Sequence, residues 1–276
     1  MSALRECPYV AVASSEEQPT DIPLHNDNQN SNSYAVAFDQ LDGSSIIGAN
    51  WAVGSIFGVW PGTEFINKSG RDMVAAAYAV HGPRTVLVIA RPVDGTDTTN
   101  LVVQEYALLD TISTTSSSTS SSWVLQRDDV RIPESKKIFA PANLRACTEN
   151  SAYRTLIDQW INERYTLRYS GGMVPDVHHI FTKGGGVFCN PAAPASPAKL
   201  RVLYEVLPLA FCVEAAGGGA LGSSSSSASN TVGVPVSVSV SALDIVLQGH
   251  DDRGTVCLGS IKEVERCVEA MSFTSS

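Results

Sequence analysis

The sequence predicts a layered α/β sandwich with mixed sheets, formed by one region that spans residues 1–276. Apolar runs typical of strands alternate along the chain with runs at helical spacing, and this interleaving is the pattern of a layered fold. A chain of 276 residues is also long enough to bury one large core. We expect residues 1–140 to form a first sheet and residues 141–276 to form the second half of the same region.

The first half is predicted to consist mainly of strands, because its apolar runs are short and rich in β-branched residues. No helix or strand is expected ahead of the first of them. The expected strands are residues 9–13, 34–38, 50–60, 85–90 and 101–109. Residues 18–33 are rich in Asn, Asp, Gln and Pro, which predicts a polar connection. Residues 72–80 have the alanine content of a short helix, which Gly82-Pro83 ends.

Residues 151–164 give the strongest helix prediction of the second half. Asn150 or Ser151 can cap its N-terminus, and its apolar positions recur at helical spacing. These positions are Tyr153, Leu156, Ile157, Trp160 and Ile161. Two further helices are expected, one at residues 208–216 and one that begins after Ser260. The expected strands of this half are residues 165–169, 179–188, 200–204, 243–247 and 255–258.

Two tracts rich in serine, residues 114–122 and 219–230, interrupt this pattern. Such tracts cannot bury enough apolar surface to offset the loss of chain entropy on folding. Both are therefore predicted to be solvent loops inserted between elements. Residues 231–240 alternate valine with small residues, which predicts an exposed strand.

Composition and charge exclude several classes of function. The formal net charge of −9 argues against a nucleic-acid partner, because no basic stripe is present to neutralise a phosphate backbone. No run approaches the ~20 apolar residues that a membrane helix needs, and no secretory signal is visible. The six cysteines show no CxxC spacing, which predicts reduced thiols in a reducing compartment.

The stretch Phe38-Asp39-Gln40-Leu41-Asp42-Gly43-Ser44-Ser45 is the candidate for chemistry. An apolar strand runs into Asp39 and Asp42, and Gly43 permits a sharp turn that directs backbone N–H groups and the following hydroxyls at an anion. Carboxylates at such a turn need a cation, since two of them ~4 Å apart repel by about 4 kcal/mol at an effective dielectric of ~20. Oxygen ligands suit Mg²⁺, with Mn²⁺ as the alternative, and argue against zinc. From the residues alone, the same acids could also be solvated surface groups.

Residues 39–45, together with Val53-Gly54-Ser55-Ile56-Phe57-Gly58-Val59-Trp60, resemble the metal-site signature of the fructose-1,6-/sedoheptulose-1,7-bisphosphatase family. The usual proline of the family is Gln40 here, at a position that supplies no ligand. The resemblance covers most of residues 8–270, apart from the two serine-rich tracts. It implies the sugar-phosphatase fold and a phosphoric monoester hydrolase that uses Mg²⁺.

The resemblance also implies which residues hold the cations. The implied metal ligands are Glu16, Glu17, Asp39, the backbone carbonyl of Leu41, Asp42 and Glu205. Glu17 is expected to polarise the attacking water, with Asp39 and Asp42 as the other catalytic carboxylates. In relatives the acidic pair lies well inside the chain. The resemblance therefore implies that an N-terminal segment is missing here, including the loop that carries the partner of Glu17.

Contacts to a sugar bisphosphate are implied in the same way. The substrate-binding residues that the resemblance implies are Gly43, Ser44, Ser45, Asn143, Arg168, Tyr169, Met173, Lys199 and Arg201. In the family, the arginine that matches Arg168 reaches a phosphate across a subunit interface, which implies a homodimer. Without the resemblance, Tyr169 and Met173 could be core residues and Lys199 an ordinary surface lysine.

One departure from the family pattern bears on the substrate. Phe188-Cys189-Asn190-Pro191 lacks the phosphate-binding tyrosine of fructose-specific relatives. Together with residues 165–169 and 172–176, this departure favours the sedoheptulose branch, which implies removal of the 1-phosphate of sedoheptulose 1,7-bisphosphate to give sedoheptulose 7-phosphate. That branch implies carbon fixation in the Calvin cycle and the chloroplast stroma, with the cytoplasm as the other compartment. Two alternatives stay open, a fructose-1,6-bisphosphatase and a non-catalytic sugar-phosphate-binding protein.

Overall fold

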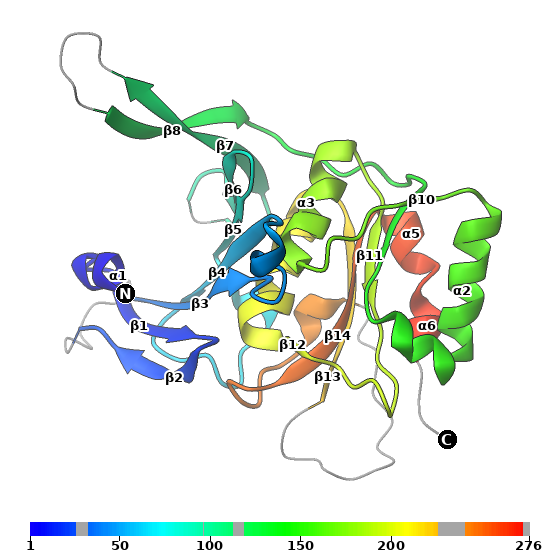
Figure 1. The fold of residues 1–276 in the computed structure, drawn as a ribbon. Coiled ribbons are helices and arrows are strands. Elements are labelled where there is room, and N and C mark those ends of the chain that lie inside the picture. The colour runs from blue at the N-terminus through cyan, green and yellow to red at the C-terminus, as the bar shows by residue number, and fades with distance from the viewer. Residues whose placement is uncertain (26–32, 96, 113–118, 226–240, 273–276) are drawn as a thin grey trace.

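Two β-sheets and two layers of helices alternate in the computed structural model (Figure 1). The structure describes residues 1–25, 33–95, 97–112, 119–225 and 241–272. The helical layer between the sheets contacts both of them, and the second helical layer covers the far face of the smaller sheet. The predicted layered α/β sandwich with mixed sheets is therefore confirmed.

The larger sheet has eight strands in the order β2-β1-β3-β4-β5-β6-β7-β8. Its strands are β1 (Val10–Ser15), β2 (Gln18–Pro23), β3 (Tyr34–Asp42), β4 (Val53–Pro61), β5 (Ala75–His81), β6 (Thr85–Pro92), β7 (Leu101–Ile112) and β8 (Thr119–Arg127). Every neighbouring pair is antiparallel except β1 and β3, which are parallel. All five strands expected in this half are present.

The smaller sheet follows the order β10-β9-β11-β14-β12, and β13 also pairs with β14. Its strands are β9 (Ile138–Pro141), β10 (Thr166–Leu167), β11 (Val187–Asn190), β12 (Leu200–Arg201), β13 (Gly219–Ser225) and β14 (Arg253–Gly259). β9 is parallel to β10 and to β11, whereas β14 is antiparallel to each of its partners. The sheet is therefore mixed.

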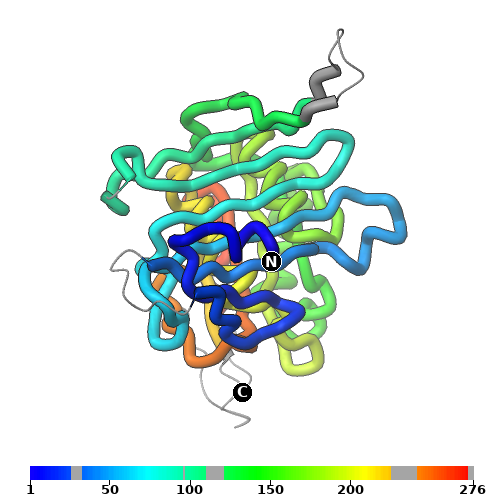
Figure 2. Tube along the Cα trace, turned by 90° about the vertical axis from the view of Figure 1, so that its left-hand side faces the viewer, coloured from blue at the N-terminus to red at the C-terminus, as the bar shows by residue number. Residues whose placement is uncertain are grey.

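The helices fall into two groups by the surfaces that they cover. The helices are α1 (Ser2–Glu6), α2 (Ser151–Asn162), α3 (Met173–Lys183), α4 (Leu207–Ala215), α5 (Ile261–Glu265) and α6 (Val268–Met271). α3 and α4 lie between the sheets, while α2, α5 and α6 lie on the other side of the smaller sheet (Figure 1). In Figure 2 the N-terminal residues, drawn in dark blue, lie in front of the larger sheet.

α4 is the centre of the main core. Every residue of this helix is buried except Glu214, because both sheets pack against it. A helix that is apolar all round is stable only inside a protein. The core of the molecule therefore sits between the two sheets.

Residues 72–80, predicted as a helix, form most of β5 instead, so that prediction was wrong. Ala76, Tyr78 and Val80 face the core, while the residues between them are only half-buried or lie on the other face. β5 pairs along its length with β4 and β6. Two flanking strands override the helical preference of alanine, which is a weak preference in any case.

The prediction of a strand at residues 179–188 was also wrong. α3 continues to Lys183, and only β11, which begins at Val187, is extended. Val174, Val177, Ile180 and Phe181 are buried at helical spacing. Gly184 ends the helix with a φ of 71°, as glycine commonly does.

The polar and serine-rich segments contain more strand than the sequence predicts. Residues 18–23 form β2, residues 119–122 begin β8, and residues 219–225 form β13. Each of these strands is held by backbone pairing, which small or polar side chains do not prevent. Residues 231–240 lie outside the described residues.

Three smaller predictions also needed correction. α1 precedes the first strand, although no element was expected there. Residues 243–247 contain a 3-10 turn, Ala242–Asp244, and one isolated bridge from Val246 to Ser69. Only Leu200–Arg201 of residues 200–204 is a strand, and a π-helical turn, Val202–Val206, follows and carries Glu205.

Candidate metal centre and the cavity beside it

Asp39 and Asp42 stand at the end of β3, where the pairing with β4 is irregular. Side chains three apart on a regular strand point to opposite faces. The register shifts between Asp39 and Asp42, however, which is how a bulge re-aims a side chain. Both carboxylates are buried, and the Leu41 N–H donates to Asp39 Oδ1 over 2.8 Å.

Asp42 also holds the start of α3. The backbone N–H of Val174 donates to Asp42 Oδ2 over 2.6 Å, and that of Met173 donates to Asp42 Oδ1 over 3.3 Å. The first turn of a helix leaves its N–H groups unpaired and carries positive partial charge, so a carboxylate is favourable there. This one side chain therefore joins the larger sheet to the helical layer.

Glu205 reaches the same place from the π-helical turn ahead of α4. The Arg201 N–H donates to Glu205 Oε2 over 2.6 Å, and the residue is only 7% exposed. Oxygen atoms of Asp39, Asp42 and Glu205 all lie within 4.8 Å of one another. The fold thus brings together three acidic residues that are up to 166 positions apart in the sequence.

The charges of this acidic cluster, Asp39, Asp42 and Glu205, are not neutralised by protein cations. Among the residues that the structure describes, no lysine or arginine forms an ion pair with any of the three. Burial raises the pKa of Asp39 to about 7 and that of Asp42 to about 6, and it raises the pKa of Glu205 well above its usual value. Buried oxygen ligands with uncompensated charge fit a hard divalent cation.

The predicted acidic pair lies at the edge of this cluster. Glu16 is half-buried, and its Oε1 lies 3.8 Å from Arg201 Nε. Glu17 is exposed at the turn between β1 and β2. Both glutamates lie close enough to contribute to the raised pKa of Asp39. The role of the Leu41 carbonyl stays a prediction.

A cavity of about 310 Å³ opens beside the acidic cluster. Six of the predicted substrate-binding residues line it, namely Gly43, Ser44, Ser45, Tyr169, Met173 and Lys199. Gly43 has a φ of 89°, which confirms the sharp turn expected after the two aspartates. Glu16, Asp42 and Glu205 line the same cavity, so a ligand there would face the acidic cluster.

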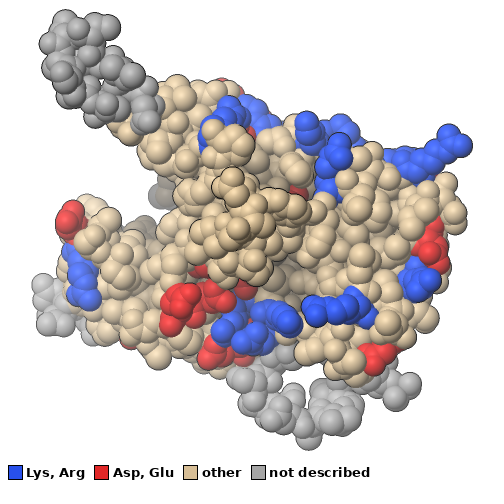
Figure 3. All heavy atoms as spheres, in the orientation of Figure 1, with Lys and Arg blue, Asp and Glu red and all other residues tan. Residues whose placement is uncertain are grey.

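Basic groups also lie close to these acids. In Figure 3, acidic side chains lie next to basic ones below the centre of the view, in the region where Figure 1 shows β12. Arg201 on β12 pairs with Glu16 and with Asp251. Lys199 has no ion pair among the residues that the structure describes, and it lines the cavity.

The structure does not bring the other three predicted substrate residues into the cavity lining. Asn143 donates its side-chain amide to the carbonyls of Pro191 over 2.8 Å and Ser196 over 3.1 Å. Arg168 is exposed, and its guanidinium donates to the Leu167 carbonyl. Arg201 is occupied by the two acids named above. Their roles toward a substrate stay predictions.

Several cavity residues were missed by the sequence analysis. They are Ala142, Gly171, Gly172, Phe188, Asn190 and Leu200. Asn190 stands at the end of β11, in the segment that was noted only for lacking a tyrosine. Its place in the cavity depends on how the smaller sheet is assembled, so no local signal could have found it.

Asp176, which the sequence analysis did not single out, holds the loop that forms one wall of the cavity. Its carboxylate is buried and accepts from the Ser170 N–H over 2.7 Å and from the Gly171 N–H over 3.3 Å. Burial raises the pKa of Asp176 to about 6. The aspartate therefore orders the segment that carries Tyr169.

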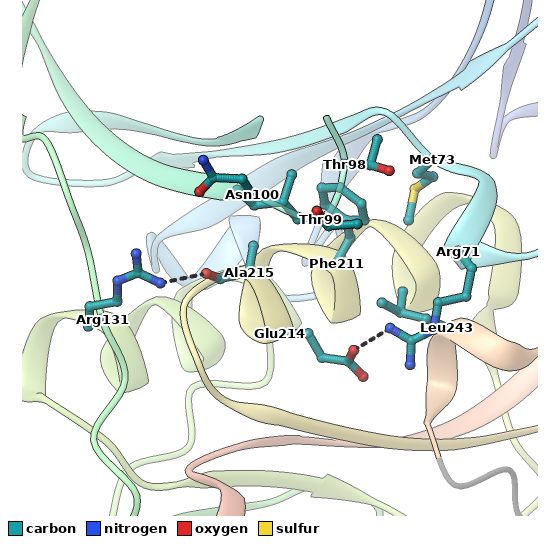
Figure 4. Close-up of a pocket in the computed structure, with 12 residues that line it drawn as sticks. Arg71, Met73, Thr98, Thr99, Asn100, Arg131, Phe211, Glu214, Ala215 and Leu243 are labelled. Carbon is teal, nitrogen blue, oxygen red and sulfur yellow. Dashed lines mark hydrogen bonds and ion pairs between the residues drawn. The ribbon is translucent and has the colours of Figure 1, made fainter. Parts of the chain in front are cut away.

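A second cavity, of about 360 Å³, lies at the other end of α4 (Figure 4). Arg71 pairs there with Glu214 over 2.7 Å, and Arg131 donates to the Ala215 carbonyl over 3.2 Å. Glu214 is thus neutralised by an arginine, unlike the members of the acidic cluster. This cavity does not fit a cation.

The sequence matches models of two protein-family domains. Residues 1–108 match the N-terminal domain of fructose-1-6-bisphosphatase, and residues 132–272 match its C-terminal domain. The chloroplastic sedoheptulose-1,7-bisphosphatase of Chlamydomonas reinhardtii is 42% identical over 274 residues, which are 99% of this chain and 61% of that protein. Its counterpart in Spinacia oleracea is 43% identical over 84% of this chain and 52% of that protein. The class 1 fructose-1,6-bisphosphatase of Citrifermentans bemidjiense is 34% identical over 84% of this chain and 61% of that protein.

Solved structures show the same similarity. A protein of Toxoplasma gondii assigned as a sedoheptulose-1,7 bisphosphatase superposes with a TM-score of 0.77 at 38% identity, covering 98% of this chain and 82% of that one. The apo form of Leishmania major fructose-1,6-bisphosphatase gives a TM-score of 0.76 at 30% identity, covering 98% and 81%. The chain spans 61% or less of the length of the curated relatives described above.

Proposed function

Because the chain belongs to the fructose-1,6-bisphosphatase family, we propose that it hydrolyses the 1-phosphate of sedoheptulose 1,7-bisphosphate to sedoheptulose 7-phosphate and phosphate. The observation that carries the proposal is the acidic cluster, whose oxygens lie within 4.8 Å of one another. The cluster adjoins a cavity that is also lined by the glycine turn, with its two serines, and by a lysine. A bisphosphorylated sugar needs this combination of groups.

The turn at Gly43, Ser44 and Ser45 would hold the phosphate that is removed. These residues line the cavity beside Asp42, and a glycine turn presents backbone N–H groups that suit a phosphate. Lys199 would add positive charge, and Tyr169 and Met173 would contact the sugar. We also assign three further residues to substrate binding, namely Asn143, Arg168 and Arg201. Of these, Asn143 and Arg168 would contact the distal part of the substrate.

Asp39, Asp42 and Glu205 would hold Mg²⁺, or Mn²⁺, together with Glu16, Glu17 and the Leu41 carbonyl. Members of this family use divalent metal ions. When bound, the cation supplies charge that neutralises phosphate oxygens in the transition state. The oxygen-only donor set of the described cluster favours a hard cation.

Glu17 would orient the water that attacks phosphorus, in line with the departing sugar oxygen. Its carboxylate is exposed on the turn that follows β1, on the side of the acidic cluster where it contributes to the pKa of Asp39. Met173 and Val174 keep Asp42 aligned through their backbone N–H groups. Alignment of this kind is what positional catalysis requires.

A fructose-1,6-bisphosphatase is the alternative within the same class. Class 1 fructose-1,6-bisphosphatases are among the relatives at 33–36% identity, below the 41–43% of the sedoheptulose enzymes. Asn190 lines the cavity in the segment where fructose-specific relatives carry a tyrosine. We therefore expect a higher kcat/KM with sedoheptulose 1,7-bisphosphate than with fructose 1,6-bisphosphate, and the reverse order would favour the alternative.

We also propose a homodimer in the chloroplast stroma, with a role in the Calvin cycle. The exposed Arg168 is available to a neighbouring subunit, and the chloroplastic enzymes of alga and plant support the compartment. The bacterial relatives leave the cytoplasm as the alternative. Among the described residues, every helix is too short or too polar to span a lipid bilayer.

The test is phosphate release by the wild-type chain and by Asp39→Asn, with Mg²⁺ and with EDTA. Replacing even the outer partner of a metal ligand costs about 10–100-fold. We therefore expect Asp39→Asn to lower kcat/KM by at least roughly 100-fold, and EDTA to abolish activity. Asp158→Asn, an equally conservative change at an exposed position on α2, is the control.

Tight binding of the bisphosphate without turnover by the wild-type chain would favour the alternative of a non-catalytic sugar-phosphate-binding protein. Undiminished activity in EDTA would overturn the metal-dependent mechanism.

A further inference from the structure

Three cysteines form a second cluster in the smaller half of the molecule. The sulfur atoms of Cys189, Cys257 and Cys267 all lie within 4.8 Å of one another. Each of the three residues is 0% exposed, and each is a free thiol. No motif predicts this thiol cluster, because Cys189 is distant in the sequence from the other two cysteines and Cys257 and Cys267 lack the spacing of a known motif.

The thiol cluster joins three separate segments. Cys189 on β11 and Cys257 on β14 are directly paired across the antiparallel strands. Cys267 stands where α5 ends and α6 begins, and its S–H donates to the Glu263 carbonyl over 3.3 Å. The strands fix two of the sulfurs, and the helical turn brings the third over them.

The described residues buried together with the thiol cluster are mainly apolar, and no lysine or arginine among them shifts the pKa of its cysteines. Its neighbours in the same buried group include Phe139, Leu156, Trp160 and Met271. Burial raises the pKa of Cys257 and of Cys267, and the acidic Glu263 raises that of Cys267 further. Hydrogen bonds with these two thiols lower the pKa of Cys189 to about 5. An ion bound by the three sulfurs would therefore be poorly solvated if the resulting complex kept a net negative charge.

We propose that this thiol cluster is a binding site for trivalent arsenic, taken up as arsenite. Arsenic in this state forms three bonds and needs no fourth ligand. Three sulfurs that each lie about 2.3 Å from one pyramidal centre, the distance that zinc takes in proteins, are roughly 3.4 Å apart. The three sulfurs already lie within 4.8 Å of one another, so each pair has to close by at most about 1.4 Å, which rotation of the side chains can supply.

The reaction balances without an oxidant or a reductant. Arsenous acid exchanges its three hydroxyl groups for the three sulfurs, so that three As–O bonds break and three As–S bonds form. Each thiol proton leaves with a hydroxyl group as water, and arsenic keeps its oxidation state. The product carries no charge, which suits the apolar surroundings.

Other thiophilic ions fit less well on grounds of charge. Three thiolates with Zn²⁺ leave one negative charge, and three with Cu⁺ leave two. Zinc also prefers four ligands, and no carboxylate or histidine of the described residues joins the three sulfurs in this group. The site therefore selects among thiophilic ions by the net charge of the complex that each would form, and not only by the affinity of each ion for sulfur.

Arsenite would reach the site through transient opening of the turn between α5 and α6. Cys267 lies in this turn, just ahead of α6, a helix of only four residues. Short elements with few backbone hydrogen bonds open more often than the core does. Once bound, arsenic would tie α6 to β11 and β14, so uptake should be slow and should raise Tm.

The experiment adds sodium arsenite to the reduced full chain and measures bound arsenic by native mass spectrometry and Tm by calorimetry. We expect one arsenic per chain, a higher Tm, and three sulfurs around arsenic in its X-ray absorption spectrum. Cys189→Ser, Cys257→Ser and Cys267→Ser should each weaken binding by roughly 100-fold or more, since a third thiol held in place acts at high effective concentration. The corresponding Cys→Ala variants serve where a serine variant fails to fold.

Cys212→Ser and Cys7→Ser are the matched controls. Cys212 is as buried as the thiol cluster but belongs to α4, and Cys7 is a partly exposed thiol. Both variants should bind arsenite as the wild-type chain does. Absence of bound arsenic after incubation in mild denaturant and refolding would overturn the proposal, as would binding that depends on Cys7 or displacement of arsenite by equimolar Zn²⁺ or Cu⁺. None of these readouts depends on phosphatase activity.

Discussion

His178 shows how much a single half-buried side chain can contribute to the pH dependence of stability. It lies on α3, and Tyr78 Oη is 3.2 Å from its Nδ1. Burial lowers the pKa of His178 to about 4, well below its ordinary value of 6.5. In the folded chain the imidazole is therefore neutral over most of the mildly acidic range.

Acid should destabilise the protein through this residue. Below pH 6.5 the unfolded chain takes up a proton at His178 while the folded chain does not, so stability is lost as the pH falls from 6.5 toward 4. The difference between a pKa of 6.5 in the unfolded chain and about 4 in the folded chain corresponds to roughly 3 kcal/mol at the low end of this window. Urea unfolding of the wild type and His178→Gln between pH 4 and 8 should show a smaller loss in the variant. Equal losses in the two proteins would assign acid unfolding to other groups.

At the scale of the residue, the site was predictable where the chemistry is local. Asp39, Asp42 and the glycine turn after them follow one another in the sequence, so their association could be predicted, although the irregular pairing with β4 that aims both carboxylates the same way could not. Glu205 could be assigned only through the resemblance, because its position depends on a π-helical turn and on the packing of α4. Asn190 and the thiol cluster depend on strand pairing in the smaller sheet and left no local signal.

At the scale of the element, the contact between β4 and α3 depends on the absence of a side chain. Gly54 pairs with Asp42 across the two strands. A Cβ placed on Gly54 would lie 2.4 Å from Cβ of Val174. Val174 is also the residue whose N–H donates to Asp42. The glycine therefore sets the distance at which α3 can approach the acidic cluster.

Gly54→Ala should consequently disturb stability and cation binding together. Overpacking of a buried site typically costs about 1–3 kcal/mol, and displacement of α3 would also release Asp42 from its two donors. Calorimetry should show a lower Tm, and titration with Mn²⁺ should show weaker binding. Gly48→Ala is the control, because nothing lies within 4 Å of the Cβ it would add.

Removing the clash should restore part of what Gly54→Ala loses. The double variant Gly54→Ala/Val174→Ala makes room for the new methyl group, although it also gives up buried methyl groups of Val174. Mn²⁺ binding should recover more fully than Tm. A double variant no better than the single one would mean that Gly54 acts through something other than this contact.

Helix and strand assignments failed at the element scale wherever packing outweighed local preference. Residues 72–80 are rich in alanine, which predicts a helix, but backbone pairing with β4 and β6 places most of them in the sheet as β5. The serine-rich residues 219–225 read as a loop, yet β14 supplies backbone partners along their whole length. By contrast, 151–164 was assigned correctly, since its N-cap from Asn150 and its buried face are both encoded in the segment itself.

At the scale of the whole molecule, the layered architecture followed from the alternation of apolar patterns, whereas strand order did not. β11 lies between β9 and β14, and β1 runs parallel to β3, neither of which the sequence specifies locally. Arg168 raises a further question at this scale, because it is exposed and lies outside the cavity of its own chain.

Mixing two inactive variants can establish whether Arg168 serves a neighbouring subunit. Asp42→Asn and Arg168→Ala should each be nearly inactive alone. In a mixed dimer, one site would combine an intact Asp42 with an intact Arg168 from the other chain, so activity should return after mixing, unfolding and refolding. Phosphate release from the mixture measures this recovery, with each refolded variant alone as the control. A mixture as inactive as its components would place Arg168 in its own site or outside any site.

The burial of α4 has a consequence for how activity fails on heating. Amide protons of so enclosed a helix exchange with water only when the whole domain opens, and Glu205 belongs to the turn immediately before it. Fraying at the β7–β8 edge or at α6 leaves that turn in place. Thermal inactivation should therefore coincide with cooperative melting instead of preceding it, and a sample warmed to just below the transition should still turn over substrate at its full rate for that temperature.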